Sequence, residues 1–199
     1  HHERGQAGAA DRFGDVEVDL EARSVKRKGE IVHLTPVEYR LLQLLIANAG
    51  TEGTLKPIEA LSVEEFEDTM RTNVTGVWLS IKHCVAPLKA RGGGSIVDLS
   101  SIAGCIGFPA MAPYIASKHA VYGLVKTAAL ELGPSNIRVN AVGPGPIDNR
   151  MIASLQDQLS PDDPAALRGG IEAGIAMRRY GTNEEVAHLL AFLASEASS

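Results

Sequence analysis

Two short apolar runs that alternate with long stretches of helical periodicity constrain the fold more than any other feature of this chain. The runs, residues 95–99 and 137–142, have the length and composition of buried strands. Helical periodicity covers residues 62 to about 89, 113–132 and 183–194. Buried strands that alternate with helices are typical of parallel α/β structure. We therefore expect residues 51–199 to form part of a doubly wound parallel sheet.

Residues 13–50 follow a different pattern. Short alternation from Phe13 to His33, with a turn at Lys28-Gly29-Glu30, indicates a small antiparallel β-sheet. The run Thr35-Pro36-Val37-Glu38 is a helix-start signal, because Thr can cap a helix and Pro fits its first turn. Leucines from Leu41 onward supply an apolar face, so one helix is expected after the sheet.

The composition is that of a globular protein. With 45% hydrophobic residues, 22% charged residues and a net charge of −5, the chain has no overall positive field to attract nucleic acid or an anionic membrane. No apolar run approaches the roughly 18 to 20 residues of a membrane helix, and no signal peptide opens the chain. Cys84 and Cys105 have neither paired nor metal-ligand spacing. We expect a cytoplasmic protein without a metal site, in which the polar residues 1–12 form a linker.

The strongest chemical pattern is a strand that ends at Ser100 and Ser101, followed by Tyr114 and Lys118 on a helix. Four-residue spacing places Tyr114 and Lys118 on one helical face, where the ammonium can lie near the phenol. A nearby positive charge lowers the pKa of a Tyr and makes its phenol a usable proton donor and acceptor for carbonyl and alcohol interconversion. By itself this spacing is a weak signal, and an ordinary surface helix pair is the alternative.

The motifs around this pattern resemble those of the short-chain dehydrogenase/reductase family. Ser101 stands thirteen residues before Tyr114. The family's order continues in Arg71-Thr72-Asn73-Val74-Thr75-Gly76, Ile137-Arg138-Val139-Asn140, Pro144-Gly145-Pro146-Ile147 and Met177-Arg178-Arg179-Tyr180-Gly181. The resemblance covers residues from about 47 to 199. It implies a partial Rossmann-like sheet and an NAD(P)-dependent oxidoreductase that acts on a small-molecule carbonyl or secondary alcohol.

The resemblance also implies a role for each matching side chain. Tyr114 would be the general acid and base, while Lys118 would lower its pKa and hold the nicotinamide ribose. Ser101 would hydrogen-bond the reacting oxygen, and Asn73 would anchor a water in the proton relay. The alternatives are a strand-end turn for Ser101 and a helix-kinking polar group for Asn73.

A pocket for NAD or NADP follows from the same resemblance, with no signal for which of the two is preferred. Pro144, Gly145 and Ile147 would shape its nicotinamide side. Asn149 stands where the family often has Thr, and it still offers a donor and an acceptor. The expected cofactor-binding residues are Asn48, Ala49 and Gly50, which match an Asn-Ala-Gly signature of the family, with Tyr114, Lys118, Pro144, Gly145, Ile147 and Asn149.

One part of the family's cofactor site has no match in the sequence. No strand before Tyr114 is followed by the Gly-rich turn that receives a pyrophosphate at a helix N-terminus. Relative to the family the chain is expected to be cut at both ends, which puts cofactor binding in doubt and predicts impaired or absent activity. Uncovered sheet faces would cause poor solubility or oligomerisation. Because family members commonly associate through the helices that hold Asn73 and Tyr114, we expect a homo-oligomer.

Residues 13–50 resemble the start of the DNA-binding domain of OmpR-type winged-helix response regulators, in which a small antiparallel sheet precedes the first helix. The recognition helix and C-terminal wing of that family have no counterpart in this sequence. Residues 1–50 hold seven Lys and Arg against eight Asp and Glu, which gives a net charge of −1. Because DNA affinity depends largely on phosphate neutralisation, we expect no specific nucleic-acid binding.

The two resemblances meet at Ala47-Asn48-Ala49-Gly50, which predicts a chimera of residues 13–50 with residues 51–199. Residues 41–46 are helix in one parent family and buried strand in the other, and the helix-start signal favours helix. The main prediction is an oxidoreductase by descent. The alternatives are a non-catalytic hybrid and a DNA-binding response-regulator remnant.

Overall fold

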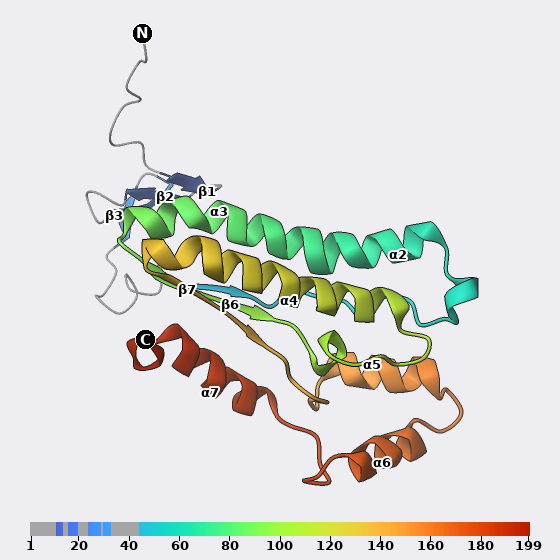
Figure 1. The fold of residues 1–199 in the computed structure, drawn as a ribbon. Coiled ribbons are helices and arrows are strands. Elements are labelled where there is room, and N and C mark those ends of the chain that lie inside the picture. The colour runs from blue at the N-terminus through green and yellow to red at the C-terminus, as the bar shows by residue number, and fades with distance from the viewer. Residues whose placement is uncertain (1–10, 14–15, 20–23, 29, 33–43) are drawn as a thin grey trace.

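The computed structural model describes residues 11–13, 16–19, 24–28, 30–32 and 44–199. The described residues form two sheets, one antiparallel with four strands and one parallel with three strands (Figure 1). Helices cover the parallel sheet, so the predicted α/β architecture of the second segment is confirmed.

The antiparallel sheet has the strand order β1-β2-β3-β4. Its strands are β1 (Asp11–Phe13), β2 (Val16–Asp19), β3 (Ser24–Arg27) and β4 (Glu30–Val32). The turn between β3 and β4 includes Lys28, whose φ of 52° is left-handed. The predicted antiparallel strands are therefore confirmed, although β1 begins at Asp11, inside the expected linker of residues 1–12. The predicted helix start at Thr35-Pro36-Val37-Glu38 lies outside the described residues.

The parallel sheet has the order β5-β6-β7. Its strands are β5 (Leu44–Ala47), β6 (Gly94–Leu99) and β7 (Ile137–Val142), so both predicted apolar runs are strands. Ile96, Val97 and Asp98 of β6 are 0% exposed, because helices cover both faces of this central strand and a strand pairs with each of its edges. The carboxyl ends of the three strands lie at the same edge of the sheet.

The predicted helix over residues 41–46 is wrong for the part that the structure describes, because Leu44–Ala47 form strand β5. The register of β5 with β6 sets Leu44 opposite Ser95 and Ala47 opposite Asp98. This pairing satisfies backbone N–H and C=O groups of β6 that would otherwise be buried without partners. The helix preference of leucine amounts to only about a few tenths of a kcal/mol per residue, so tertiary pairing decides the conformation.

Helices lie on both faces of the parallel sheet (Figure 1). They are α2 (Val63–Met70), the π-helical turn η2 (Arg71–Thr75), α3 (Gly76–Ala90), α4 (Ala112–Leu132), α5 (Arg150–Leu159), α6 (Pro164–Gly174) and α7 (Asn183–Ala194), with short turns η1 (Ile58–Ala60), η3 (Ile102–Gly104), η4 (Gly133–Ser135) and η5 (Glu196–Ser198). The rod formed by α2, η2 and α3 runs beside α4 on one face, and α7 packs against β6 from the other. None of the described helices is both long enough and apolar enough to cross a bilayer.

Local sequence signals explain where two of these helices begin. In front of α2, the Ser62 side chain accepts a hydrogen bond from the backbone of Glu65, whose carboxylate accepts one from the backbone of Ser62. Thr182 and Glu185 form the same reciprocal pair in front of α7. These capping boxes satisfy backbone donors that the first turn of each helix leaves free.

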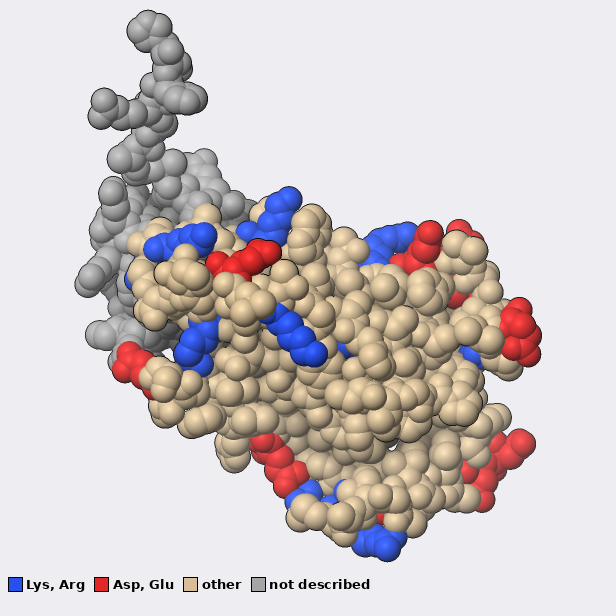
Figure 2. All heavy atoms as spheres, in the orientation of Figure 1, with Lys and Arg blue, Asp and Glu red and all other residues tan. Residues whose placement is uncertain are grey.

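The main core lies between the parallel sheet and helices α3 and α4. Its buried members are Ala47, Val77, Ile81, Leu88, Ile96, Val121, Val125, Ala128, Leu132, Ile137 and Val139. Buried apolar surface stabilises a fold by about 25 cal/mol per Å², so this layer anchors the strands whose ends carry the site. On the face that α3 and α4 form, Figure 2 shows a broad area without charged side chains. Trp78 of α3 and Leu130 of α4 are exposed, the latter at 82%.

Candidate active site

Three segments leave the carboxyl ends of the parallel strands at one edge of the sheet. Residues 48–50 follow β5, residues 100–101 follow β6, and residues 143–147 follow β7. A backbone hydrogen bond of 2.9 Å from Ile102 N to Pro144 O joins the second and third segments. This edge is where open α/β sheets bind their ligands.

Tyr114 and Lys118 lie on one face of α4, as their spacing predicts. Both are buried, at 7% and 6% exposed, and the Lys118 Nζ lies 5.6 Å from the centre of the Tyr114 ring. The Lys118 ammonium also donates a 2.9 Å hydrogen bond to the backbone oxygen of Leu99, the last residue of β6. The amine is therefore held between the helix and the end of the central strand.

The surroundings of Tyr114 shift the pKa of its phenol. Burial raises it above the usual value for tyrosine, hydrogen bonding to the Ser101 side chain opposes this, and the charge of Glu52 raises it further. Burial also lowers the pKa of Lys118 to about 8, against the opposing charge of Asp98. Lys118 is not among the groups that cause this shift, so the expected lowering of the Tyr114 pKa by Lys118 stays a prediction.

Asn73 is 1% exposed and connects three parts of the site. Its Nδ2 donates to the backbone oxygen of Thr51 at 2.8 Å and to the Ser117 hydroxyl at 3.0 Å, while its Oδ1 accepts from the backbone of Thr51 at 2.9 Å. The Ser117 hydroxyl then donates to the backbone oxygen of Tyr114 at 2.7 Å. The π-helical turn η2 holds Asn73, and such turns are frequent at functional sites. Ser117 stands directly before Lys118 in the sequence, but its link to Asn73 was not predicted.

The two serines at the end of β6 have different surroundings. Ser100 is buried, and its hydroxyl donates to the backbone oxygen of Lys118 at 2.9 Å. Ser101 is half-buried and extended, and its Oγ accepts from the backbone of Ala103 at 3.1 Å, which caps the turn η3. The structure thus contains the strand-end turn that was the alternative role for Ser101. In this turn the Ser101 oxygen is an acceptor, so the O–H of Ser101 stays available to donate a hydrogen bond to a reacting oxygen.

The expected cofactor-binding residues divide into two groups. Gly50 lies beside the predicted catalytic groups, because a Cβ at its position would be 3.4 Å from Asn73 Oδ1 and 3.7 Å from Lys118 Nζ. Asn48 and Ala49 are exposed at the end of β5. On the opposite side, Ile147 forms a parallel bridge with Gly181, and the space around Gly145 is open.

Asn149 has a structural role that the sequence reasoning missed. Its Oδ1 accepts hydrogen bonds from the backbone of Met151 at 2.9 Å and of Ile152 at 3.2 Å. These contacts cap the N-terminus of α5. The acceptor that was expected to face a cofactor is therefore engaged in starting this helix, and the polar residue immediately before a helix was the signal that could have shown it.

Apolar side chains surround Tyr114 on the side of α5. Its hydroxyl lies 3.9 Å from the sulfur of Met151. The apolar cluster around the phenol consists of Ala103, Met111 and the partly buried Leu55, Ile115, Met151 and Leu155. The phenol is therefore packed among hydrophobic side chains. In the described part of the chain, no group of three or more His, Cys, Asp or Glu side chains is arranged to hold a metal ion.

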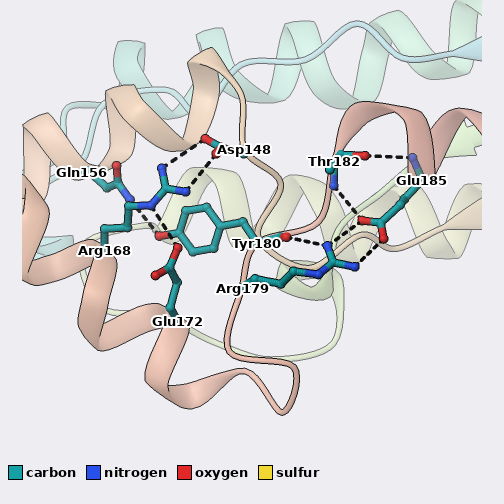
Figure 3. Close-up of polar contacts among 8 residues, drawn as sticks. All are labelled: Asp148, Gln156, Arg168, Glu172, Arg179, Tyr180, Thr182 and Glu185. Atoms are coloured by element: carbon teal, nitrogen blue, oxygen red, sulfur yellow. Dashed lines mark hydrogen bonds and ion pairs between the residues drawn. The ribbon is translucent and has the colours of Figure 1, made fainter.

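A polar network around Arg168 holds α5 and α6 in place (Figure 3). The guanidinium binds both carboxylate oxygens of Asp148, at 3.2 and 2.9 Å, and Glu172 at 3.0 Å. It also lies 4.6 Å from the centre of the Tyr180 ring, whose hydroxyl accepts from Gln156 of α5 at 2.8 Å. Arg168 thereby connects α6 with α5 and with the chain segment after β7. These three parts of the chain lie outside the β-sheets, so side-chain contacts such as these hold them together.

A second polar pair fixes the start of α7 next to this network (Figure 3). Arg179 binds the two carboxylate oxygens of Glu185 at 3.0 and 2.6 Å, and it also donates to the backbone oxygen of Tyr180 at 2.9 Å. Hydrogen bonding to Arg179 lowers the pKa of Glu185 to about 2. The charge of this pair is therefore present throughout the neutral range.

Comparison with known proteins identifies the family. Residues 4–199 match the family model described as Enoyl-(Acyl carrier protein) reductase. Levodione reductase of Leifsonia aquatica is 30% identical over 99% of this chain and 75% of its own length. The trans-4-hydroxycyclohexanecarboxylate dehydrogenase of Sinomonas cyclohexanicum is 41% identical over 81% of this chain and 56% of its own length. The chain belongs to the short-chain dehydrogenase/reductase family.

Solved structures agree with this assignment. NAD+-bound xylitol dehydrogenase matches with a TM-score of 0.72 and 34% identity, over 78% of this chain and 63% of that one. ElxO with NADP bound matches with a TM-score of 0.69 and 32% identity, over 77% of this chain and 60% of that one. The chain thus spans about three fifths of these structures. The matched range of the family model includes residues 13–50, so the winged-helix fusion stays a prediction.

Proposed function

We propose that this chain carries the catalytic part of an NAD(P)-dependent oxidoreductase that interconverts a carbonyl and a secondary alcohol. The observation that carries the proposal is the burial of Tyr114 and Lys118 side by side at the edge where three parallel strands end. Ser101 follows the central strand at that edge, and its side chain influences the Tyr114 phenol as a hydrogen-bond partner. Relatives that share this fold include dehydrogenases and reductases.

The side chains present fit the nicotinamide half of such a cofactor. The Lys118 ammonium has three N–H donors, and Leu99 takes one of them, which leaves donors for ribose hydroxyls. The open space at Gly145 and the backbone of Ile147 would meet the nicotinamide, while Asn48, Ala49 and Gly50 would lie on the other side. A bound nicotinamide supplies or accepts the hydride.

In the reducing direction, Tyr114 donates its phenolic proton to the carbonyl oxygen, and the Ser101 O–H donates a hydrogen bond to the same oxygen. The raised pKa of Tyr114 keeps the phenol protonated at neutral pH, as a proton donor requires. In the oxidising direction, the phenol must first lose its proton.

The substrate proposed here is an apolar, alicyclic ketone or alcohol. Met111, Met151 and Leu155 give the phenol a hydrophobic surrounding that matches hydrocarbon better than a sugar. Flexible methionines adapt to rings of different shape. A relative named for cyclohexanol, from Acinetobacter, is 37% identical over 81% of this chain, which favours the same class.

The test is turnover of cyclohexanone and cyclohexanol with NADH, NADPH and their oxidised forms, followed by the absorbance of the reduced nicotinamide. We expect measurable turnover, which Tyr114→Phe should lower by about 10²- to 10⁴-fold. A sugar ketone of similar size serves as the comparison substrate. Preference for the sugar would contradict the substrate class, and no turnover with any substrate at saturating cofactor would contradict the oxidoreductase proposal.

Cofactor affinity is a separate question. These 199 residues contain no Gly-rich turn before Asn48 that could receive a pyrophosphate at a helix N-terminus. We therefore propose that the chain binds NADH and NADPH weakly and has impaired activity. Calorimetric titration measures this directly. Micromolar affinity for either cofactor contradicts the proposed weakness.

Three further properties predicted from the sequence are retained as proposals. A homo-oligomer through α3 and α4 is supported by the exposed Trp78 and Leu130, and light scattering during gel filtration tests it.

A winged-helix origin of residues 13–50 is supported by the four-stranded antiparallel sheet, which is separate from the parallel one. A cytoplasmic location without specific DNA binding rests on composition and charge.

A further inference from the structure

Asp98 is a charged residue in the middle of the central strand, at a position where the sequence pattern calls for an apolar one. It is 0% exposed, and neither of its carboxylate oxygens has a hydrogen-bond partner among the described residues. A buried carboxylate without partners is costly and is therefore rarely an accident of packing. Its position in the fold indicates what it does.

The alternation of side chains along β6 places Asp98 on the face of the sheet that α3 and α4 cover. Ile96, Asp98 and Ser100 share one face of the strand, because side chains two apart point the same way. Ile96 packs in the core cluster with Val121 of α4. The Ser100 hydroxyl donates to the backbone oxygen of Lys118, one turn closer to the start of that helix. Asp98 thus lies between the two contacts, beneath the turn that carries Lys118.

Other polar side chains near this turn have no donor to spare for Asp98. Its neighbours across the sheet are Ala47 and Ala141, which offer no polar side chain. Both N–H groups of the Asn73 amide are engaged, and the Ser117 hydroxyl donates to a backbone oxygen. The Lys118 ammonium, in contrast, has three N–H groups, and one of them donates to the Leu99 oxygen.

Several elements packed against β6 carry titratable side chains. β5 has no titratable side chain, and Arg138 of β7 binds Leu193 and Ser195 oxygens at the end of α7. The remaining titratable groups on these elements are Lys82, His83, Cys84 and Lys89 on α3, Tyr114, His119, Tyr122, Lys126 and Glu131 on α4, and Glu184, Glu185 and His188 on α7. Lys118 is the charged group that acts on Asp98.

We propose that Asp98 is a positioning residue, the buried counter-charge that keeps the Lys118 ammonium charged beside Tyr114. The pKa values support this geometry. Burial raises the pKa of Asp98 to about 7 while Lys118 opposes the rise, and burial lowers the pKa of Lys118 to about 8 while Asp98 opposes the fall. Between these two values the carboxylate and the ammonium are both charged. The catalytic consequence rests on the proposed function, but the charge coupling itself does not.

The first test measures the titration of Lys118 by NMR in protein with isotope-labelled lysine. Asp98→Asn keeps the shape of the side chain and removes its charge, so the Lys118 midpoint should fall by about one pH unit or more. The control is Ser95→Ala, on the opposite face of the same strand, where the hydroxyl donates to the Leu193 oxygen. An unchanged or higher midpoint in Asp98→Asn overturns the proposal.

A second variant covers the case in which Asp98→Asn does not fold. Lys118→Met removes the ammonium, and the midpoint of Asp98, followed through isotope-labelled aspartate, should then rise above its wild-type value. No rise overturns the proposal. Neither titration needs activity, so a shifted midpoint without turnover in the wild type would reject the proposed function alone. Turnover in the wild type with unshifted midpoints rejects the counter-charge alone.

If the wild type is active, the dependence of kcat on pH separates coupling from damage to the fold. In Asp98→Asn the alkaline fall of kcat should begin at lower pH, together with the lower Lys118 midpoint. Ser95→Ala should keep the wild-type profile. A uniform loss of kcat at every pH, with the profile unmoved, indicates a structural role for Asp98 and contradicts the proposal.

Discussion

Asn73 donates a 3.0 Å hydrogen bond to Ser117, and so links the π-helical turn of one helix to the helix that carries Tyr114 and Lys118. The bond connects residues 44 positions apart in the chain and is buried. Because Asn73 also holds the backbone of Thr51 by two further bonds, a single side chain sets the distance between three segments of the site.

Removing this side chain should destabilise the fold. Asn73→Ala leaves the partly buried N–H and C=O of Thr51 without these partners, which lowers the free energy of unfolding by about 2 kcal/mol. Urea unfolding followed by circular dichroism measures the loss. Thr72→Ala, at an exposed position in the same turn, is the matched control and should change stability little. Equal losses in the two variants would show that the hydrogen bonds of Asn73 are unimportant.

Tyr114→Phe should lower kcat by about 10²- to 10⁴-fold, because it removes the proposed proton donor and little else. Nicotinamide binding, measured by calorimetry, should change much less than kcat. Tyr122→Phe is the control, since Tyr122 is a second tyrosine of α4, and its hydroxyl makes a long contact of 3.5 Å with the Ser101 oxygen. If both variants lose kcat to the same extent, Tyr114 has no special role.

The stability of the fold should depend on pH through Asp98. Its pKa is raised from 3.8 to about 7, so the folded state keeps a proton that the unfolded chain releases between these values. Stability from this group is therefore fully present below pH 3.8 and is lost as the pH rises towards about 7. The difference in unfolding free energy between wild type and Asp98→Asn, measured across this range, isolates the effect. A difference that stays constant with pH contradicts the raised pKa.

Arg168→Ala should affect substrate binding more than stability. The ion pairs of Arg168 are exposed and contribute little to stability, but they position α5, which carries Met151 and Leu155 beside the phenol. We expect KM to rise several-fold with an almost unchanged melting temperature. Arg71→Ala breaks another exposed ion pair, to Asp68, and is the matched control. An unchanged KM in Arg168→Ala would show that the ion pairs of Arg168 do not affect substrate binding.

Added salt offers an independent check of the same network. Exposed ion pairs are screened at high ionic strength, so KM of the wild type should rise with salt towards that of Arg168→Ala. The variant has already lost these pairs, and its own KM should depend less on salt. Parallel salt dependence in both proteins contradicts the role assigned to Arg168.

Much of the fold was predictable because its signals are local. The buried strands at residues 95–99 and 137–142 and the long helices follow from apolar periodicity over short windows. The relation of Tyr114 to Lys118 follows from helix geometry alone, since four residues nearly complete one turn. For such features, neighbours in the chain are also neighbours in space.

What only the tertiary structure decided depends on contacts between distant residues. Leu44–Ala47 form a strand because β6 offers an unpaired edge, and the helix-start signal before them carries no information about that edge. The raised pKa of Tyr114 comes from burial by other elements, which its helical spacing to Lys118 does not reveal. The position of Asp98 beneath Lys118 likewise arises from packing α4 on β6. Local pattern determines which conformation a segment prefers, while burial and long-range pairing determine its environment and therefore its chemistry.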